Sequence, residues 1–225
     1  MMVTTMARND EAIQRNILAE LDWDPQVRPN EIGVTVSDGV VALTGWVDSY
    51  ARKWAAERAA HRLSGVRAVA NDIAVRLSTA TGRTDAEIAT SVTRALEWDA
   101  FIPADGLSVT VANGWVVLRG EVEWEYQRRA AERSVRRLTG VQGLTNGIQV
   151  RPRVRPSAEE LRHRLVTALV RTVSADAQQL GIEVDDGTVT LRGTVRSALE
   201  RQEAERVAWS GPGVEEVRNE LVVQG

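Results

Sequence analysis

The sequence predicts an α+β protein built from three tandem α-β-β-α-β units, each a three-stranded mixed sheet with two helices on one face. The main observation is an internal repeat, because Gly45, Gly120 and Gly193 each follow a Val-x-Leu-x strand pattern. These glycines are separated by 75 and then 73 residues. The same offsets relate two further sets of residues: the turns Asp38-Gly39, Asn113-Gly114 and Asp186-Gly187, and the asparagines Asn71, Asn146 and Asn219. Self-similarity at a fixed period indicates a repeated structural unit.

An amphipathic helix is predicted at the start of each unit. In the first unit Ile13, Ile17 and Leu21 recur every four residues, which places them on one face of a helix. The equivalent apolar triplets are Ile88, Val92 and Leu96, and then Leu161, Leu165 and Leu169. Acceptors for helix caps stand near the three expected starts, at Asp10, Asp85 and Ser157.

A β-hairpin is predicted after each first helix. Apolar residues alternate before the turn, as in Ile32, Val34 and Val36, and again after it, as in Val41 and Leu43. Asp-Gly and Asn-Gly supply the positive φ angles that a two-residue hairpin turn needs. The outward positions vary between units while the inward ones stay apolar, which is typical of a sheet covered on one face.

A second helix and a last strand complete each unit. The second helices are expected over residues 49–63, 123–138 and 197–209. The last strands carry the apolar sets Val69, Ile73 and Val75, then Leu144, Ile148 and Val150, then Val217, Leu221 and Val223. The resulting boundaries are an N-terminal tail at 1–8, units at 9–76, 84–150 and 157–225, a polar linker at 77–83 and a Pro/Arg linker at 151–156.

Composition excludes some classes of protein. With 43% hydrophobic and 26% charged residues the chain has an ordinary globular composition. The formal charge of -3 gives no general attraction to nucleic acid, and the absence of cysteine excludes disulfides and thiolate sites. No apolar run approaches the ~20 residues of a transmembrane helix, and the N-terminus lacks an export signal. We therefore expect a cytoplasmic protein, with peripheral contact to the inner membrane as one option.

The repeated unit resembles the BON domain of bacterial osmotically inducible and nodulation-related proteins. The resemblance rests on the element order, on the strand glycine followed by valine (Gly45 and Val47, Gly120 and Val122, Gly193 and Val195), and on Ala-Glu-Arg in the second helix (from Ala56, Ala131 and Ala204). It covers nearly the whole chain, which looks like a triple-BON protein of the OsmY-like, transport-associated type. The resemblance implies a non-enzymatic module linked to phospholipid surfaces, envelope integrity or osmotic stress.

The repeated glycines are interpreted as fold-defining, because a glycine at the end of a strand lets the second helix turn back over the sheet. More suggestive of function is a set of arginines on the second helix of the middle unit. Four of them share one helical face and a fifth lies beside it, as Arg129, Arg133, Arg136 and Arg137 with Arg128. Near an anionic surface each could contribute about 1 kcal/mol. The neighbouring linker arginines, Arg151, Arg153 and Arg155, would enlarge the patch if they folded beside it.

Tryptophan is over-represented, with seven Trp against one Phe and two Tyr. Trp54 aligns with Arg129 and Gln202, and Trp115 aligns with Val40 and Thr188, so both are expected to be exposed. Trp23 and Trp98 occupy equivalent places at the ends of the first helices. Amphipathic rings at exposed positions suit membrane and protein interfaces, or packing between neighbouring units.

The leading hypothesis is peripheral association with anionic phospholipid through the second-helix faces, with shallow Trp insertion. One alternative is a protein-interaction scaffold or chaperone-like module that uses exposed Trp and sheet edges. Another is a small-molecule or ion sensor in clefts between units. No catalytic set, cofactor motif or metal-ligand pattern is recognisable around the two histidines, His61 and His163, so we expect no enzyme, no cofactor and no metal. Nucleic acid is not an expected partner, and the oligomeric state stays open.

Overall fold

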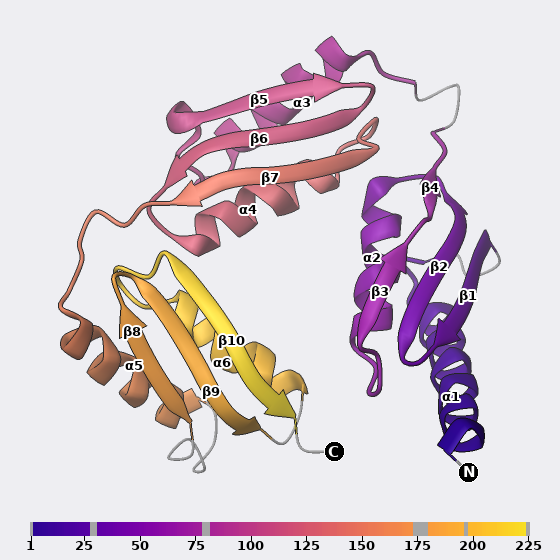
Figure 1. The fold of residues 1–225 in the computed structure, drawn as a ribbon. Coiled ribbons are helices and arrows are strands. Elements are labelled where there is room, and N and C mark those ends of the chain that lie inside the picture. Colours follow the sequence, from indigo (N-terminus) through magenta and orange to yellow (C-terminus); the bar gives the residue numbers. More distant parts are fainter. Residues whose placement is uncertain (1, 28–30, 78–81, 173–179, 196–197, 224–225) are drawn as a thin grey trace. The chain divides into compact units, whose positions relative to one another are not determined.

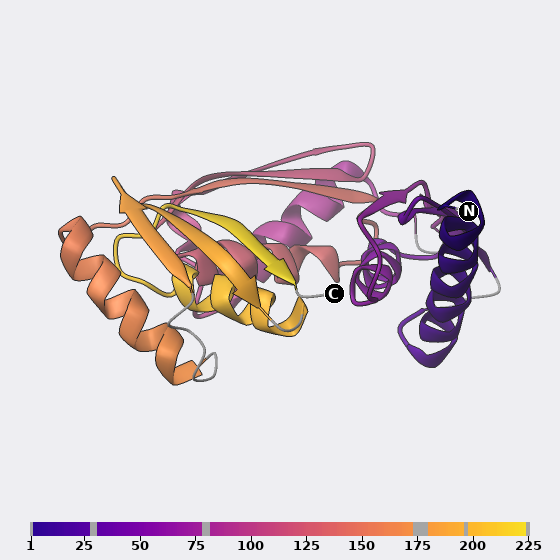
Figure 2. The same cartoon turned by 60° about the horizontal axis from the view of Figure 1, so that its bottom comes forward.

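The computed structural model describes residues 2–27, 31–77, 82–172, 180–195 and 198–223. Three α+β repeats follow one another along the chain, and each has two helices on one face of its own sheet (Figures 1 and 2). The predicted fold class is confirmed.

Repeat 1 begins with the long helix α1 and ends with an interrupted strand. Its elements are α1 (Met2–Trp23), β1 (Ile32–Ser37), β2 (Val40–Val47), α2 (Tyr50–His61), β3 (Ala68–Asn71) and β4 (Ala74–Val75). β1 pairs antiparallel with β2, whereas β3 and β4 both pair parallel with β2. The two short strands therefore act as one last strand, and the sheet is mixed.

Repeat 2 has the same element order with an uninterrupted last strand. Its elements are α3 (Asp85–Trp98), the 3₁₀ turn η3 (Ala104–Gly106), β5 (Leu107–Ala112), β6 (Trp115–Val122), α4 (Glu125–Arg136) and β7 (Gly143–Val150). The strands lie in the order β5-β6-β7, so the second strand of the hairpin is central. The order is that of repeat 1.

Repeat 3 closes the described chain with a third copy of this arrangement. Its elements are α5 (Ala158–Thr172), β8 (Gly181–Asp185), β9 (Thr188–Val195), α6 (Ala198–Trp209) and β10 (Glu216–Val223). β9 pairs antiparallel with β8 and parallel with β10. The hairpin and the parallel last strand again share one central strand.

Each repeat has its own apolar core. The three helical triplets that the periodicity predicts are all buried, from Ile13, Ile17 and Leu21 to Leu161, Leu165 and Leu169. In repeat 1 they pack with inward residues of β2 such as Val41 and Leu43, and with alanines of α2. The small alanine side chains, Ala55, Ala56, Ala59 and Ala60, are all buried, so α2 approaches its sheet closely.

The hairpin turns have the geometry that their sequences predict. Both central residues of every turn have positive φ, with 52° at Asp38 and 73° at Gly39 in the first. The predicted two-residue turns are therefore present. Gly45 also has positive φ, 110°, but it lies inside β2 and not at its end. A Cβ on Gly45 would stand 2.0 Å from the carbonyl oxygen of Glu31, so the glycine permits a close backbone approach at the start of β1.

Two of the three expected helix caps are placed differently by the structure. Ser157 does cap α5, since its Oγ accepts the Glu160 N–H at 3.2 Å. Asp10 lies inside α1, which begins at Met2, and Asp85 is already the first residue of α3. Their carboxylates instead accept the backbone N–H groups of the hairpin turns, as at Asp38 (2.8 Å) and Gly39 (3.0 Å) in repeat 1. Helix periodicity alone could not distinguish a cap from a contact with a turn 28 residues away.

Candidate binding surfaces

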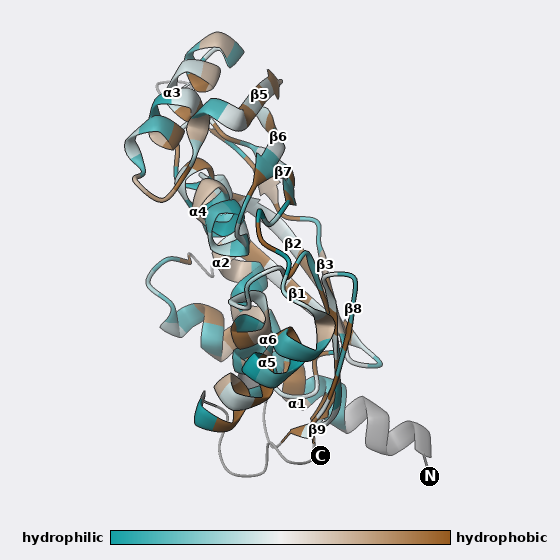
Figure 3. Cartoon of the chain, turned by 90° about the vertical axis from the view of Figure 1, so that its left-hand side faces the viewer, coloured by the Kyte–Doolittle hydropathy of each residue, from teal (hydrophilic) through white to brown (hydrophobic). Residues whose placement is uncertain are grey.

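The outward face of α4 carries the exposed arginines that the sequence singled out. The opposite side of this helix is buried, with Ala130, Ala131 and Val135 in the core of repeat 2. Arg129 and Arg133 are exposed on the outward side, and Arg137 is exposed just beyond the end of the helix. Part of α4 has the teal colour of hydrophilic residues in Figure 3. We call Arg129, Arg133 and Arg137 the α4 arginine face.

A buried glutamate holds two arginines at the start of α4. Glu125 is only 3% exposed, and its carboxylate oxygens lie 2.9 Å from Arg128 Nε and 3.1 Å from Arg129 Nε. Arg128 and Arg129 are themselves partly exposed, so this is an ion-pair cluster at the helix surface. Glu125 reduces the net charge near Arg129, while Arg133 and Arg137 lie farther along the helix.

Arg136 differs from its neighbours on α4, because it is 9% exposed. The five predicted arginines therefore do not form one uniformly exposed stripe. Arg128 is half-buried, Arg136 is buried, and the remaining three form the α4 arginine face. The sequence pattern correctly placed them on a helix and could not reveal their unequal exposure.

The two predicted tryptophans also have local partners. Trp54 on α2 was expected to be exposed but is half-buried, and the Arg58 guanidinium carbon lies 4.8 Å from its ring centroid, in the range of a cation-π contact. Trp115 on β6 is exposed, but its indole Nε1 donates a hydrogen bond to Thr145 Oγ1 at 3.0 Å. A Cβ on Gly143 would stand 2.3 Å from the Trp115 ring, so that ring covers the neighbouring strand β7. Trp115 thus has a structural role on the outer sheet face.

The most exposed aromatic side chains are Trp23 and Trp98, which were not among the predicted binding residues, and Phe101. Trp23 at the end of α1 is 84% exposed, and Trp98 at the end of α3 is 88% exposed. Phe101 follows Trp98, is 64% exposed, and meets the exposed Tyr126 of α4 edge-to-face at 6.2 Å between ring centroids. The sequence does mark the two Trp positions as equivalent, because each lies two residues after the last buried leucine of its helix, at Leu21-Asp22-Trp23 and Leu96-Glu97-Trp98.

The linker arginines pair with acidic residues. Arg151 lies 3.7 Å from Glu121, Arg153 lies 3.6 Å from Glu123, and Arg155 lies 3.3 Å from Asp186. Arg155 also forms an ion pair with Glu215. These glutamates and aspartates offset the charge that the arginines would add to a basic patch.

The recurring Glu and Asn residues have a structural role in every repeat. Asn71 donates its side-chain amide to the Lys53 carbonyl (3.2 Å) and to Glu57 Oε2 (2.9 Å), and its Oδ1 accepts the Ile73 N–H (3.3 Å). Asn146 and Asn219 make the same three contacts in their own repeats. This asparagine clamp ties the second helix to the last strand.

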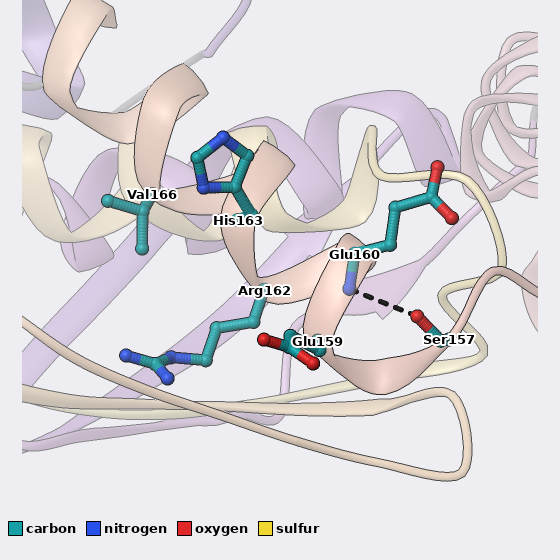
Figure 4. A pocket seen from close by; sticks show the side chains of 6 residues that line it. All are labelled: Ser157, Glu159, Glu160, Arg162, His163 and Val166. Atoms are coloured by element: carbon teal, nitrogen blue, oxygen red, sulfur yellow. Dashed lines mark hydrogen bonds between the residues drawn. The ribbon is translucent and has the colours of Figure 1, made fainter.

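Metal-ligating side chains are not clustered in the described parts of the chain. Among those residues no group of three or more His, Asp or Glu could hold a metal ion. A pocket along α5 is lined by Ser157, Glu159, Glu160, Arg162, His163 and Val166. In Figure 4 the imidazole of His163, the carboxylate of Glu160 and the guanidinium of Arg162 point in different directions. This pocket offers no paired acid and base.

Within the residues that the structure describes, no helix combines the length and the apolar character that crossing a bilayer requires.

The chain is similar to several known proteins, to different degrees. Escherichia coli K12 osmotically-inducible protein Y is 27% identical over 147 residues, which cover 64% of this chain and 73% of that protein. Solved structures of CdsD from the Chlamydia trachomatis type III secretion system cover 93% of this chain and 91% of theirs at 17% identity, with a TM-score of 0.27. Its C-terminal domain matches at 16% identity, covering 94% and 96%, also with a TM-score of 0.27.

A known protein domain matches the repeated unit itself. The BON domain matches the chain three times, over residues 9–76, 84–152 and 157–225. Apart from the first residues of α1, these three matches contain the three α-β-β-α-β repeats, their hairpin glycines and their asparagine clamps. The chain therefore belongs to the BON domain family, of which it carries three tandem copies.

Proposed function

We propose that this chain is a non-enzymatic BON-domain protein, linked to osmotic stress, that attaches peripherally to anionic phospholipid surfaces. Its relative in Escherichia coli is named for osmotic induction, which supports the physiological part of the proposal. The observation that carries the binding part is the α4 arginine face: Arg129, Arg133 and Arg137 are exposed on the side of repeat 2 opposite its core.

The electrostatics favour the second helices of repeats 1 and 2. Within its bounds, α4 has four arginines and two glutamates, which gives +2, and Arg137 follows directly. α2 has three cations, Arg52, Lys53 and Arg58, against Glu57, which also gives +2. α6 has two arginines against three glutamates, which gives -1. Each cation near an anionic membrane contributes about 1 kcal/mol, so the first two helices suit such a surface and α6 does not.

Aromatic side chains near α4 add an apolar component. The Phe101–Tyr126 contact brings the segment after α3 against the first turn of α4, three residues before Arg129. Aromatic rings are favoured at the interface between lipid headgroups and acyl chains, where one part of the ring is apolar and another polar. An exposed aromatic pair beside exposed arginines supports shallow insertion after electrostatic approach.

Vesicle co-sedimentation over a salt series tests the proposal. The full chain is expected to sediment with phosphatidylglycerol-containing vesicles at low salt, and progressively less as salt screens the charges. Replacing the α4 arginine face by Arg129→Gln, Arg133→Gln and Arg137→Gln should weaken binding at least ~10-fold, because about 2–3 kcal/mol is removed.

The matched control removes three exposed arginines that lie elsewhere, through Arg94→Gln, Arg119→Gln and Arg162→Gln. Both triple variants lower the formal charge by three, so a larger loss of vesicle binding in the first variant would show that the location of the arginines matters. An absence of binding to anionic vesicles at low salt, or equal losses in the two variants, would contradict the proposal.

A protein-interaction module is the second candidate, and Trp23 favours it. This ring is almost fully exposed, and it lies beside the exposed Asp22, whose charge opposes an anionic membrane. Exposed Trp with a polar rim is typical of protein interfaces. A partner whose capture is lost on Trp23→Ala, while vesicle binding is unchanged, would support this function.

A further inference from the structure

Repeat 3 contains a cleft between its helices α5 and α6, whereas the proposed membrane surface belongs to repeat 2. We call it the α5–α6 cleft. Its volume is about 300 Å³, at the lower end of small-molecule sites. The residues that carry the argument are three arginines, Arg164, Arg171 and Arg206, and three apolar residues, Leu165, Ala168 and Val207.

The floor of the cleft is apolar. Leu165 of α5 and Val207 of α6 are buried members of the repeat 3 core, and Ala168 packs against that core while half-buried. Water in contact with such a floor gains few hydrogen bonds, so an apolar ligand segment would displace it favourably. The floor therefore fits an alkyl or other apolar group.

The rim of the cleft carries three arginines, of which two are paired with glutamates. Arg164 is paired with Glu160 at 2.5 Å, and Arg206 Nε is paired with Glu203 at 2.9 Å. Arg171 is exposed and has no ion pair among the residues that the structure describes. Three arginines against two glutamates leave a formal charge of +1, which matches a monoanionic head group.

The other repeats bridge the corresponding helix pair. In repeat 1, Arg62 donates to Glu20 at 2.7 Å and to Asp24 at 3.3 Å, which joins α1 to the end of α2. By the repeat offsets Glu20 corresponds to Ala168 and Arg62 to Ser210, so repeat 3 has small residues at both ends of this bridge. Ser210 lines the α5–α6 cleft, which is therefore open where repeat 1 has an ion pair.

Repeat 2 also has a polar link in this region. Ser134 Oγ donates to Asp99 Oδ2 at 3.1 Å. The corresponding pair in repeat 3 is Val207 and Thr172, and Val207 contributes apolar surface to the cleft. Two of the three repeats thus join their helices with polar side chains, whereas repeat 3 has an apolar floor with a cationic rim.

We propose that the α5–α6 cleft binds a small amphiphilic monoanion of the fatty-acid class. The apolar chain lies on Leu165, Ala168 and Val207, and the carboxylate pairs with Arg171 at the rim. A purely inorganic anion would leave the floor unfilled, and an uncharged alcohol would leave Arg171 without a partner.

Calorimetric titration of the full chain with decanoate, kept below its micelle concentration, tests the site. Saturable binding of one decanoate per chain is expected, with no comparable binding of sulfate and weaker binding of decanol. Arg171→Gln should weaken decanoate binding about tenfold, the loss expected for one charge-assisted contact. The exposed Arg162→Gln, which removes the same charge outside the cleft, should leave the affinity unchanged.

A second variant closes the cleft. Ala168→Glu with Ser210→Arg recreates in repeat 3 the Glu20–Arg62 bridge of repeat 1, so decanoate binding should be lost while the thermal unfolding midpoint is kept or raised. If this double variant misfolds, the surface change Arg171→Gln still decides the question. Wild-type decanoate affinity in Arg171→Gln, an equal loss in Arg162→Gln, or unsaturable binding of several decanoates would overturn the proposal.

Discussion

Repeats 1 and 2 hold their hairpin turns differently from repeat 3. In the first two, an aspartate of the first helix accepts both N–H groups of the turn: Asp10 in repeat 1, and Asp85 with distances of 2.8 Å to Asn113 N and 2.8 Å to Gly114 N in repeat 2. The equivalent residue in repeat 3 is Ala158, which has no such acceptor. The turn backbone itself is unchanged, with positive φ at both central residues.

In repeat 3 the turn is contacted by an arginine, where repeats 1 and 2 use an aspartate. Arg155, in the linker before α5, pairs with Asp186 of the turn and with Glu215, whose side chain lies beside Gly187. The hairpin turn is thus contacted through its backbone donors in repeats 1 and 2. In repeat 3 it is contacted through the side chain of Asp186, with Glu215 as a second partner of Arg155. All three repeats therefore keep the apolar core and the backbone geometry of the turn, whereas the polar contacts to the turn differ between repeats.

The largest expected effect concerns what all three repeats share. Asn146→Ala removes the donor to the Arg128 carbonyl and to Glu132, and the acceptor for Ile148 N–H. Loss of these contacts at a half-buried site should destabilise repeat 2 by about 2 kcal/mol. Hydrogen exchange of the full chain, read repeat by repeat, measures the change locally.

The other two copies provide the control for this comparison. Asn71→Ala and Asn219→Ala remove the same contacts in repeats 1 and 3, so each should lower protection in its own repeat by a similar amount. A repeat that tolerated this change would show that the asparagine clamp is not part of the common framework.

Much of the fold could be predicted from the sequence because its signals are local and occur three times. The triplet Ile88, Val92 and Leu96 has helical spacing, and all three residues are buried. Asn113-Gly114 has the composition of a tight hairpin turn and adopts positive φ at both positions. A chance pattern would not recur at the same offset in three copies, so repetition strengthened each of these inferences.

The candidate site was less predictable because exposure depends on contacts distant in the sequence. Arg129 and Arg136 share a helical face, yet one is exposed and the other buried. Trp115 was expected to be exposed, and it is, but its ring is engaged with Thr145 and Gly143 of the next strand. The α5–α6 cleft lies where Ala168, Ser210 and Val207 replace polar residues of repeat 1 or repeat 2. No local sequence pattern marks these positions, because they come together only through the packing of α5 against α6.

An exchange of aspartate and alanine tests the turn comparison directly. Asp85→Ala in repeat 2 should cost about 1–2 kcal/mol, since two hydrogen bonds to a charged acceptor are lost. Ala158→Asp in repeat 3 should stabilise that repeat by roughly 0.5–1 kcal/mol, because a carboxylate there can accept the turn N–H groups and lies at a helix N-terminus. Repeat-resolved hydrogen exchange again measures both changes.

Arg155→Gln distinguishes the two ways of holding the turn. This substitution should lower the stability of repeat 3 more in the wild-type chain than in the Ala158→Asp variant, because in the variant the aspartate also contacts the turn. If Ala158→Asp destabilises repeat 3, the acidic side chains of Asp186 and Glu215 outweigh the new hydrogen bonds, and the proposed equivalence of the three turns is wrong.

The smallest expected effect compares the helix starts of repeats 2 and 3. At α3, Glu87 accepts the Thr84 N–H at 2.8 Å while Thr84 Oγ1 accepts the Glu87 N–H at 3.3 Å, which is a capping box. At α5, Ser157 accepts the Glu160 N–H, but the Glu160 carboxylate pairs with Arg164 instead. The hydrogen bonds from the Thr84 backbone and hydroxyl hold the pKa of Glu87 below its ordinary value.

A lowered pKa means that the folded state favours ionised Glu87. Its contribution to stability is therefore complete above the pKa of the unfolded chain, and it is lost as the pH falls through the lower folded-state pKa. Thr84→Ala removes the hydroxyl and leaves the backbone donor, so the pKa of Glu87 should rise part of the way toward its ordinary value in an NMR titration. The outcome against the capping box would be an unchanged Glu87 pKa in Thr84→Ala, since the hydroxyl would then contribute nothing to the ionised carboxylate.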